Sequence, residues 1–181
     1  GADIALDITN PFACRDVITR VNPDAIVHCA AYTKVDLAEK EHDEAFRING
    51  FGSQAIASAC FVAGVPICFV STDYVFDGRK SEPYNEGDPV NPLNVYGASK
   101  LAGEEAVRHC CPRHWIVRTS WLYGENGPCF PRTILNAGRT RPELRIVADQ
   151  LGAPTFTPDL AAGLVELIQT TVYGTYHMVN S

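Results

Sequence analysis

The sequence has no surplus of positive charge. Its 15 lysines and arginines are outnumbered by 21 aspartates and glutamates, which gives a net charge of -6 and a pI near 5.3. A protein that neutralises the phosphates of a nucleic acid needs a clustered basic surface. The charge balance therefore argues against nucleic acid as a partner, and we expect none.

Long apolar runs are lacking as well. Runs such as 65–70 fall far short of the ~20 residues that cross a bilayer. The opening segment, Gly1–Leu6, does not have the charged and apolar regions of a secretion signal. We therefore expect a cytoplasmic protein without a membrane partner.

The seven cysteines form an odd set, with no Cys-x-x-Cys pair and no histidine at metal-ligand spacing. This pattern predicts free thiols in a reducing compartment and no metal site. Cys29 and Cys68 fall inside apolar runs, where a thiol packs as a small hydrophobic side chain. The adjacent Cys110 and Cys111 are predicted to end a helix.

Strand-like and helix-like segments alternate along the 181 residues, a length that suits one domain. Three short, nearly continuous apolar runs are typical of strands covered on both faces, and we expect them side by side. The pattern predicts an α/β fold with a doubly wound, mostly parallel sheet. The predicted strands are 24–29, 66–71, 114–119 and 174–179, and the predicted helices are 10–21, 43–63, 95–109 and 159–170.

Glycines and prolines gather in the segment 77–93, within a polar background. This composition predicts a long surface loop, and loops of that length in compact domains often carry function.

The glycine-rich turn G-x-G-x-x-G is absent. A doubly wound nucleotide-binding domain normally begins with a strand, this turn and a helix, which together hold the pyrophosphate of a dinucleotide. We therefore expect that the first βαβ unit of such a domain is missing from the sequence, and that the remainder alone binds a dinucleotide weakly.

A tyrosine and a lysine stand four residues apart, Tyr96 and Lys100, at the start of a predicted helix. This spacing places both side chains on one helix face. An ammonium group beside a phenol lowers the phenol's pKa, as an acid that protonates a carbonyl oxygen requires. The pair predicts proton transfer, although a solvated Tyr/Lys face would show the same spacing.

Polar residues follow two of the predicted strands. Ser71-Thr72-Asp73-Tyr74 comes directly after the strand ending at Val70, and His28 to Thr33 leaves the preceding strand in the same way. Ligands bind at the carboxyl ends of strands in open α/β sheets. We therefore expect Thr72, Tyr96 and Lys100 to face one cleft.

These segments resemble the extended short-chain dehydrogenase/reductase family, over essentially the whole sequence. Within the family the sequence is most similar to the reductases of dTDP-4-keto-6-deoxy sugars, which complete dTDP-L-rhamnose synthesis. The resemblance implies a partial, Rossmann-like NAD(P)-binding domain over 1–181, with substrate-domain elements at about 122–158. The segments that carry it are 71–78 (Ser-Thr-Asp-Tyr-Val-Phe-Asp-Gly), 92–104, 118–124 (beginning Arg-Thr-Ser-Trp) and 149–155.

The resemblance also implies a role for each matched residue. Tyr96 would protonate the C4 carbonyl oxygen of the sugar, Lys100 would hold the nicotinamide ribose, and Thr72 would hydrogen-bond the reacting oxygen. NADPH or NADH would supply the hydride, a dTDP-sugar would be the partner, and a homodimer is a possible assembly. Other matched positions would contact the cofactor's adenine and ribose (Asp7, Ile8, Ala31, Tyr32 and Thr33) or the sugar nucleotide (Asp73 and Trp121).

Several alternatives stay open at this point. Trp121 could be a core residue, Asp7 could cap the helix that begins at Asn10, and His28, where the family commonly has Asn, is expected to pack at a strand end. A non-catalytic regulatory subunit, like the β subunit of methionine adenosyltransferase, would keep the same fold. An inactive fragment is a further alternative. The residue that would separate NADH from NADPH lies outside the matched segments.

Overall fold

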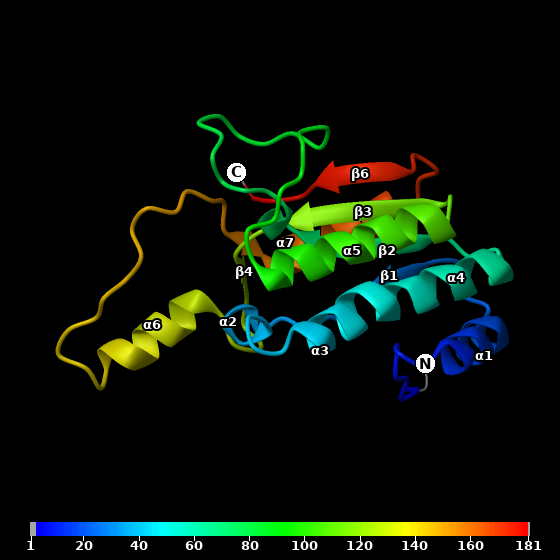
Figure 1. Ribbon diagram of the computed structural model, residues 1–181, viewed down its shortest axis with the longest axis horizontal. Helices are drawn as coiled ribbons and strands as arrows, with labels where there is room; N and C mark the ends of the chain where they lie inside the picture. The colour runs from blue at the N-terminus through cyan, green and yellow to red at the C-terminus, as the bar shows by residue number, and fades with distance from the viewer. Residues whose placement is uncertain (1–2, 181) are drawn as a thin grey trace.

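The computed structural model describes residues 3–180, which form a four-stranded parallel sheet with helices on both faces (Figure 1). Of the segment Gly1–Leu6, the first two residues lie outside the described part. The doubly wound, Rossmann-like prediction is confirmed, and the three apolar runs lie side by side. In sheet order the strands are β1 (Ile26–His28), β2 (Ile67–Thr72), β3 (His114–Thr119) and β6 (Gly174–His177).

Three of the predicted helices form close to their expected bounds, because their ends carry the expected signals. The side chain of Asn10 accepts a hydrogen bond from the amide of Ala13, and Asn94 caps its helix in the same way. Proline occupies the first turn of two of them, where no intrahelical amide is needed. The helices are α1 (Pro11–Val21), α5 (Val95–Cys110) and α7 (Thr157–Leu167).

The predicted helix 43–63 is interrupted, so the prediction of one regular helix is wrong. It consists of α3 (His42–Phe46), a π-helical segment η1 (Arg47–Gly52) and α4 (Ser53–Ala63). A Cβ placed on Gly52 would lie 2.8 Å from Ile8 Cδ1, so the wide turn brings this backbone close to the segment before α1. Segments of π-helix occur frequently at functional sites.

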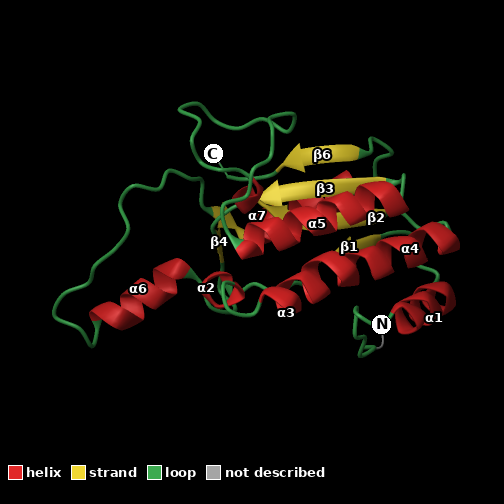
Figure 2. Ribbon diagram, in the orientation of Figure 1, coloured by secondary structure: helices red, strands yellow, loops and turns green. Residues whose placement is uncertain are grey.

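The sheet buries a separate apolar core on each face. Side chains from α1, α4 and α5 pack on one face, where Ile116 of β3 points, and α7 packs on the other, where Trp115 and Val117 point. Successive residues of a strand point to opposite faces, so a strand that is covered on both sides is apolar throughout. Figure 2 shows α4 and α5 together along one side of the strands.

Several short elements had no signal in the sequence pattern. They are α2 (Val35–Ala38), the 3₁₀ turn η2 (Asp73–Val75), β4 (Leu122–Tyr123), α6 (Phe130–Gly138) and β5 (Thr155–Phe156). β4 and β5 form a second, two-stranded parallel sheet. α6 and the loop after it project away from the main sheet, and α6 has no buried residue (Figure 1).

The segment 77–93 contains neither helix nor strand, as expected, and α5 ends at the Cys110-Cys111 pair. Cys68 is fully buried, but Cys29 is exposed, because β1 ends at His28 and the chain turns outward there. The packing prediction is therefore wrong for Cys29. Over residues 3–180, no helix combines the length and apolar character needed to cross a membrane.

Candidate active site

The carboxyl end of β2 presents a hydroxyl and a carboxylate. Thr72 is buried at the last position of the strand, and its hydroxyl donates to Asp73 Oδ1 at 3.0 Å while accepting from the amide of Tyr74 at 3.2 Å. Burial raises the pKa of Asp73, and hydrogen bonds from Thr72 and nearby amides act against that rise. The strand end is therefore ordered by its own side chains.

Two glycines let α5 pack closely on its neighbours, Gly97 on the turn η2 after this strand and Gly103 on η1. A Cβ on Gly97 would lie 2.2 Å from the backbone oxygen of Tyr74, and one on Gly103 would lie 2.4 Å from the backbone oxygen of Asn49. Side-chain carbons do not approach oxygens so closely, so these positions need glycine. The close packing brings the first turn of α5, with Tyr96, against η2.

Tyr96 lies beside Thr72, as the sequence predicted. Burial raises the pKa of the Tyr96 phenol to about 12, and the Thr72 hydroxyl acts in the opposite direction. The ring of Tyr74 meets the ring of Tyr96 edge-on, with centroids 5.8 Å apart. The phenol and the hydroxyl therefore share one partly buried position at the carboxyl edge of the sheet.

Lys100 is buried one turn further along α5, with 3% of its surface exposed. Its Nζ donates to the backbone oxygen of Val70 at 2.7 Å and lies 4.1 Å from the centre of the Phe69 ring. Burial lowers the pKa of Lys100 to about 8, while the carboxylate of Glu104 raises it. The ammonium faces the strand and not the phenol, so the expected lowering of the Tyr96 pKa by Lys100 is wrong in this structure.

Asn49, which no sequence pattern had indicated as a site residue, lies in the π-helix η1 and is 1% exposed. Its Oδ1 accepts from the amide of Tyr32 at 2.8 Å, and its Nδ2 donates to the oxygen of Tyr32 at 3.1 Å and to Ser99 Oγ at 2.9 Å. Ser99 lies between Tyr96 and Lys100. Asn49 links the loop after β1 to α5 through partners that lie 17 and 50 positions away in the sequence. Such distant contacts leave no periodic pattern in the sequence.

The η1 segment also lies against the residues before α1. Ile8 packs on Gly52, and Arg47 Nη1 donates to Thr9 Oγ1 at 2.6 Å. Asp7 is exposed and accepts from the amide and hydroxyl of Thr9, whereas Asn10 caps α1, so the capping alternative for Asp7 is not what the structure shows. η1 thus contacts each of the three segments in which cofactor residues were predicted.

The three predicted cofactor residues in the loop after β1 differ in burial. Ala31 is half-buried and Thr33 is exposed at the sheet edge. Tyr32 is buried against Ala38 and Ala45, and its hydroxyl donates to Glu41 Oε2 at 2.6 Å. Burial and, to a smaller extent, the Glu41 carboxylate raise the pKa of Tyr32 to about 12. The polar atoms of Tyr32 are engaged within the chain, so this residue shapes the loop.

Trp121 lies two residues beyond the end of β3, in the left-handed region at φ 47°. It is 43% exposed and packs against Gly152, where a Cβ would lie 2.8 Å from the indole. Its exposure argues against the core alternative. A cavity of about 480 Å³ beside α6 is lined by none of the predicted site residues.

His28 is a packing residue, as expected. Its Nε2 lies 3.1 Å from Ser53 Oγ, and its ring lies 5.4 Å from that of Phe69. Burial, with a smaller effect of the Lys100 charge, lowers its pKa to about 4. Within the described residues, no group of three or more His, Cys, Asp or Glu side chains could hold a metal ion.

The donor set at the sheet edge fits a ribose. An ammonium group has three N–H donors, and one hydrogen bond from Lys100 Nζ to a described residue is recorded, to Val70. The remaining N–H donors of this buried ammonium, one helical turn from Tyr96, suit the paired hydroxyls of a nucleoside.

A doubly wound parallel sheet with a Tyr/Lys pair and a threonine at its carboxyl edge defines the class: extended short-chain dehydrogenases/reductases. The sequence as a whole narrows this class, because the family model for the RmlD substrate binding domain matches residues 2–181. The chain belongs to this family.

Three known proteins illustrate the similarity. The dTDP-4-dehydrorhamnose reductase of Sinorhizobium fredii is 47% identical over 86% of this chain and 54% of its own length. That of Escherichia coli is 42% identical over 100% of this chain and 62% of its own. The crystal structure of a dTDP-4-dehydrorhamnose reductase from Bacillus anthracis in complex with NADP has 47% identity and a TM-score of 0.94, and the match covers 97% of this chain and 63% of that one. The chain thus spans less than two thirds of the length of these relatives.

Proposed function

We propose that the protein containing this chain reduces a dTDP-4-keto-6-deoxy sugar to dTDP-L-rhamnose with NADPH or NADH. The observation that carries the proposal is the position of the Tyr96 phenol, beside the Thr72 hydroxyl and one helical turn from the buried ammonium of Lys100. The three relatives described above are named dTDP-4-dehydrorhamnose reductases, and one of them is in complex with NADP.

Each residue has a defined part in this proposal. Reduction of the C4 carbonyl places negative charge on its oxygen, which needs a proton and a hydrogen bond. Tyr96 donates the proton from its phenol, and Thr72 donates a hydrogen bond to the same oxygen. The nicotinamide cofactor supplies the hydride when it is bound. Lys100 holds its ribose through the N–H donors that Val70 leaves free.

The remaining predicted positions complete the proposal. Asp73 and the exposed indole of Trp121 contact the sugar nucleotide, from the carboxyl ends of β2 and β3. Ala31 and Thr33 border the cofactor's ribose, with the loop held in shape by Tyr32 and Asn49. Asp7 and Ile8 border its adenine. The small sheet of β4 and β5, with α6, represents the substrate-domain portion at about 122–158.

A purely regulatory role is the less well supported alternative. A subunit that only binds has no need for a phenol, a threonine hydroxyl and a buried lysine at one strand edge. The burial that lowers the pKa of Lys100 also costs folding free energy. Such strongly shifted pKa values are found often at functional sites. These three residues together support turnover.

The cysteines and the exposed phenylalanines support a proposed location and assembly for the protein. All seven cysteines lie within the described residues and none is disulfide-bonded, which supports a reducing cytoplasm. Phe51 on η1 and Phe61 on α4 are 47% and 61% exposed, and exposed aromatic side chains of this kind support the proposal of a homodimer.

The direct test supplies the full-length protein that contains this chain with a dTDP-4-keto-6-deoxy sugar and each cofactor, and follows cofactor oxidation together with the sugar product. We expect oxidation that depends on the sugar and yields dTDP-L-rhamnose. A UDP- or GDP-linked 4-keto sugar is the matched control substrate. Cofactor binding without turnover of the dTDP-sugar would favour the regulatory alternative.

A further inference from the structure

Glu104 is a fully buried carboxylate on α5, and the proposed reaction does not use it. It receives four hydrogen bonds from three elements. Ser71 Oγ of β2 donates at 2.6 Å, Arg118 of β3 donates through Nε at 2.9 Å and Nη2 at 2.7 Å, and Arg108 of α5 donates at 2.8 Å. Burial raises the pKa of Glu104, but the bonds and charge of Arg118 outweigh that effect, so the pKa lies below its ordinary value. The group is a buried anion.

The position of this anion relates it to the active site. Glu104 lies one helical turn after Lys100 and two turns after Tyr96, on the same side of α5. Ser71 immediately precedes Thr72. In the sheet Ser71 pairs with Arg118, and Thr72 pairs with Thr119. The Glu104 carboxylate therefore joins α5, which carries Tyr96 and Lys100, to β2, and it does so at Ser71, the residue before Thr72.

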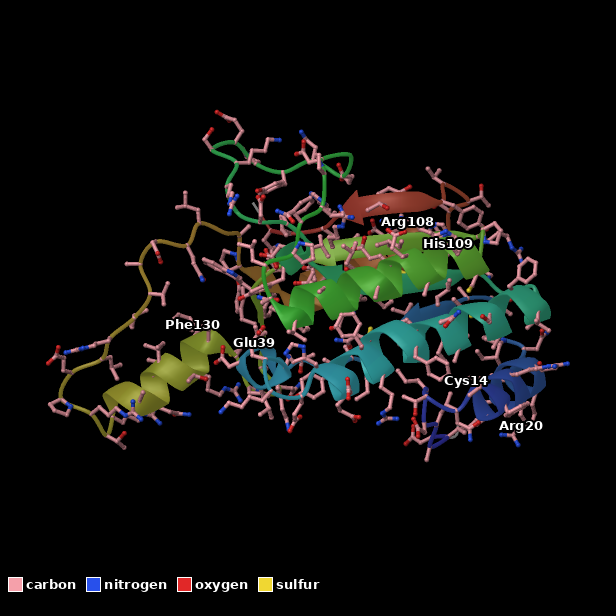
Figure 3. The ribbon with its side chains drawn as sticks, viewed as in Figure 1. Cys14, Arg20, Glu39, Arg108, His109 and Phe130 are labelled. Carbon is pink, nitrogen blue, oxygen red and sulfur yellow. The ribbon has the colours of Figure 1, made fainter. Side chains whose placement is uncertain are left out.

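Arg118 extends this connection to the long loop 77–93. Its Nη1 donates to the backbone oxygen of Glu86 at 3.4 Å, and its guanidinium lies 5.0 Å from the centre of the Phe76 ring. The carboxylate of Glu86 accepts from the amide of His177 in β6 at 3.0 Å. Arg108, labelled in Figure 3 above α5, reaches Thr175 of β6 at 3.4 Å. The cluster thus joins α5, β2, β3, β6 and the loop 77–93 around the buried carboxylate.

Glu104 also acts on Lys100 through its charge. The groups facing the ammonium are Glu104 on its own helix, His28 and Cys29 at the end of β1, and the Val70 oxygen with the Phe69 ring on β2. His28, with its pKa near 4, is neutral at physiological pH. Glu104 is the permanently charged anion in this set.

We propose that Glu104 is a positioning residue of the active site, which fixes the helix of Tyr96 and Lys100 at one separation from Thr72 and holds a negative charge one helical turn from Lys100. The inference rests on the proposed function. A purely structural carboxylate would affect folding and nothing else. Glu104, by contrast, affects the rate through the Tyr96–Thr72 geometry and affects the pH dependence through Lys100.

The test compares Glu104→Gln with Glu104→Asp in the full chain. Glutamine keeps the shape and loses the charge, whereas aspartate keeps the charge and loses one methylene of reach. We expect both to lower kcat about tenfold or more, because misplacement of reacting groups is costly. In the Gln variant alone, the basic limb of the kcat/KM profile moves to lower pH, by about one unit.

Glu105→Gln is the matched control. Glu105 is the next residue of α5, its carboxylate is 52% exposed, and it pairs with the same Arg108 at 2.7 Å. We expect this variant to keep kcat within about twofold and the wild-type pH profile. A folded Glu104→Gln protein with wild-type kcat and pH profile, altered only in its unfolding temperature, would overturn the proposal.

Two further measurements keep the inference testable. If Glu104→Gln does not fold, Ser71→Ala removes a single bond, and we expect a loss in kcat of about threefold at unchanged cofactor affinity. Wild-type kcat in this variant would count against the proposal. If the full-length wild-type protein does not turn over the dTDP-sugar, the proposed function fails, and NMR titration of Lys100 in wild type, Glu104→Gln and Glu104→Asp still tests the role of the charge. A lower pKa in the Gln variant alone supports that role, and an identical pKa in all three contradicts it.

Discussion

Asn49 Nδ2 donates a hydrogen bond of 2.9 Å to Ser99 Oγ, across 50 positions of the chain. Ser99 Oγ in turn donates to the backbone oxygen of Tyr96 at 2.8 Å. The side-chain amide of Asn49 also accepts a hydrogen bond from the backbone N–H of Tyr32 and donates one to the backbone oxygen of Tyr32. The loop after β1 and the first turn of α5 are therefore held by one buried side chain.

We expect Asn49→Ala to lower the free energy of unfolding by about 1–3 kcal/mol, because it leaves the buried polar groups of Tyr32 without partners. It should also weaken cofactor affinity, since the loop that carries Ala31 loses its attachment. Denaturant unfolding and cofactor titration measure the two effects. Asn91→Ala, on the exposed loop, is the control and should change neither. Wild-type cofactor affinity in a folded Asn49→Ala variant would contradict the role of η1.

Gly97→Ala tests the close approach of α5 to η2. The added Cβ would lie 2.2 Å from the backbone oxygen of Tyr74, so α5 and η2 must move apart. We expect a loss of about 1–3 kcal/mol in the free energy of unfolding and a lower kcat. Gly87→Ala, where a Cβ would have no neighbour within 4 Å, should stay within about 0.5 kcal/mol of wild type. Equal behaviour of the two variants would show that the packing is not tight.

Lys100 gives a pH dependence of stability with a defined sign. Its pKa is about 8 in the fold and near 10.5 in the unfolded chain. Between these values the unfolded chain binds a proton that the folded chain does not, so stability from this group rises with pH and is lowest below pH 8. Lys100→Met should therefore raise the free energy of unfolding at pH 7 by about 1–3 kcal/mol while abolishing turnover. A destabilised Lys100→Met protein would contradict this expectation.

His28 gives a second window, on the acid side. Burial lowers its pKa from 6.5 to about 4, so the folded chain binds fewer protons than the unfolded chain between these values. Stability from this group is complete above pH 6.5 and is lost as pH falls towards 4, by ~2 kcal/mol or more. His28→Asn should flatten that slope, whereas His109→Asn, at the exposed end of α5 (Figure 3), should leave it unchanged. Parallel slopes in all three proteins would count against the burial argument.

The sequence predicted the features that follow a period or a motif. The strands, α1, α5 and α7, and the meeting of Tyr96 with Thr72 all follow from apolar runs, caps and spacing. The features that the sequence could not show depend on contacts between residues far apart in the chain. The π-helix needs the approach of Gly52 to Ile8, the direction of Lys100 needs the Val70 oxygen, and Asn49 and Glu104 act through distant partners. Short elements such as α2 and β5 have too few residues to show a period.

The most direct test of the account is the rate of dTDP-4-keto-6-deoxy sugar reduction in Tyr96→Phe. Tyr74→Phe is the matched control, since it removes the hydroxyl of the tyrosine whose ring contacts Tyr96 edge-on. If Tyr96 supplies the proton, its loss lowers kcat by ~10²-fold or more and leaves cofactor affinity nearly unchanged, while Tyr74→Phe stays within about threefold of wild type. A kcat for Tyr96→Phe within about threefold of wild type would contradict the assignment of Tyr96 as the proton donor.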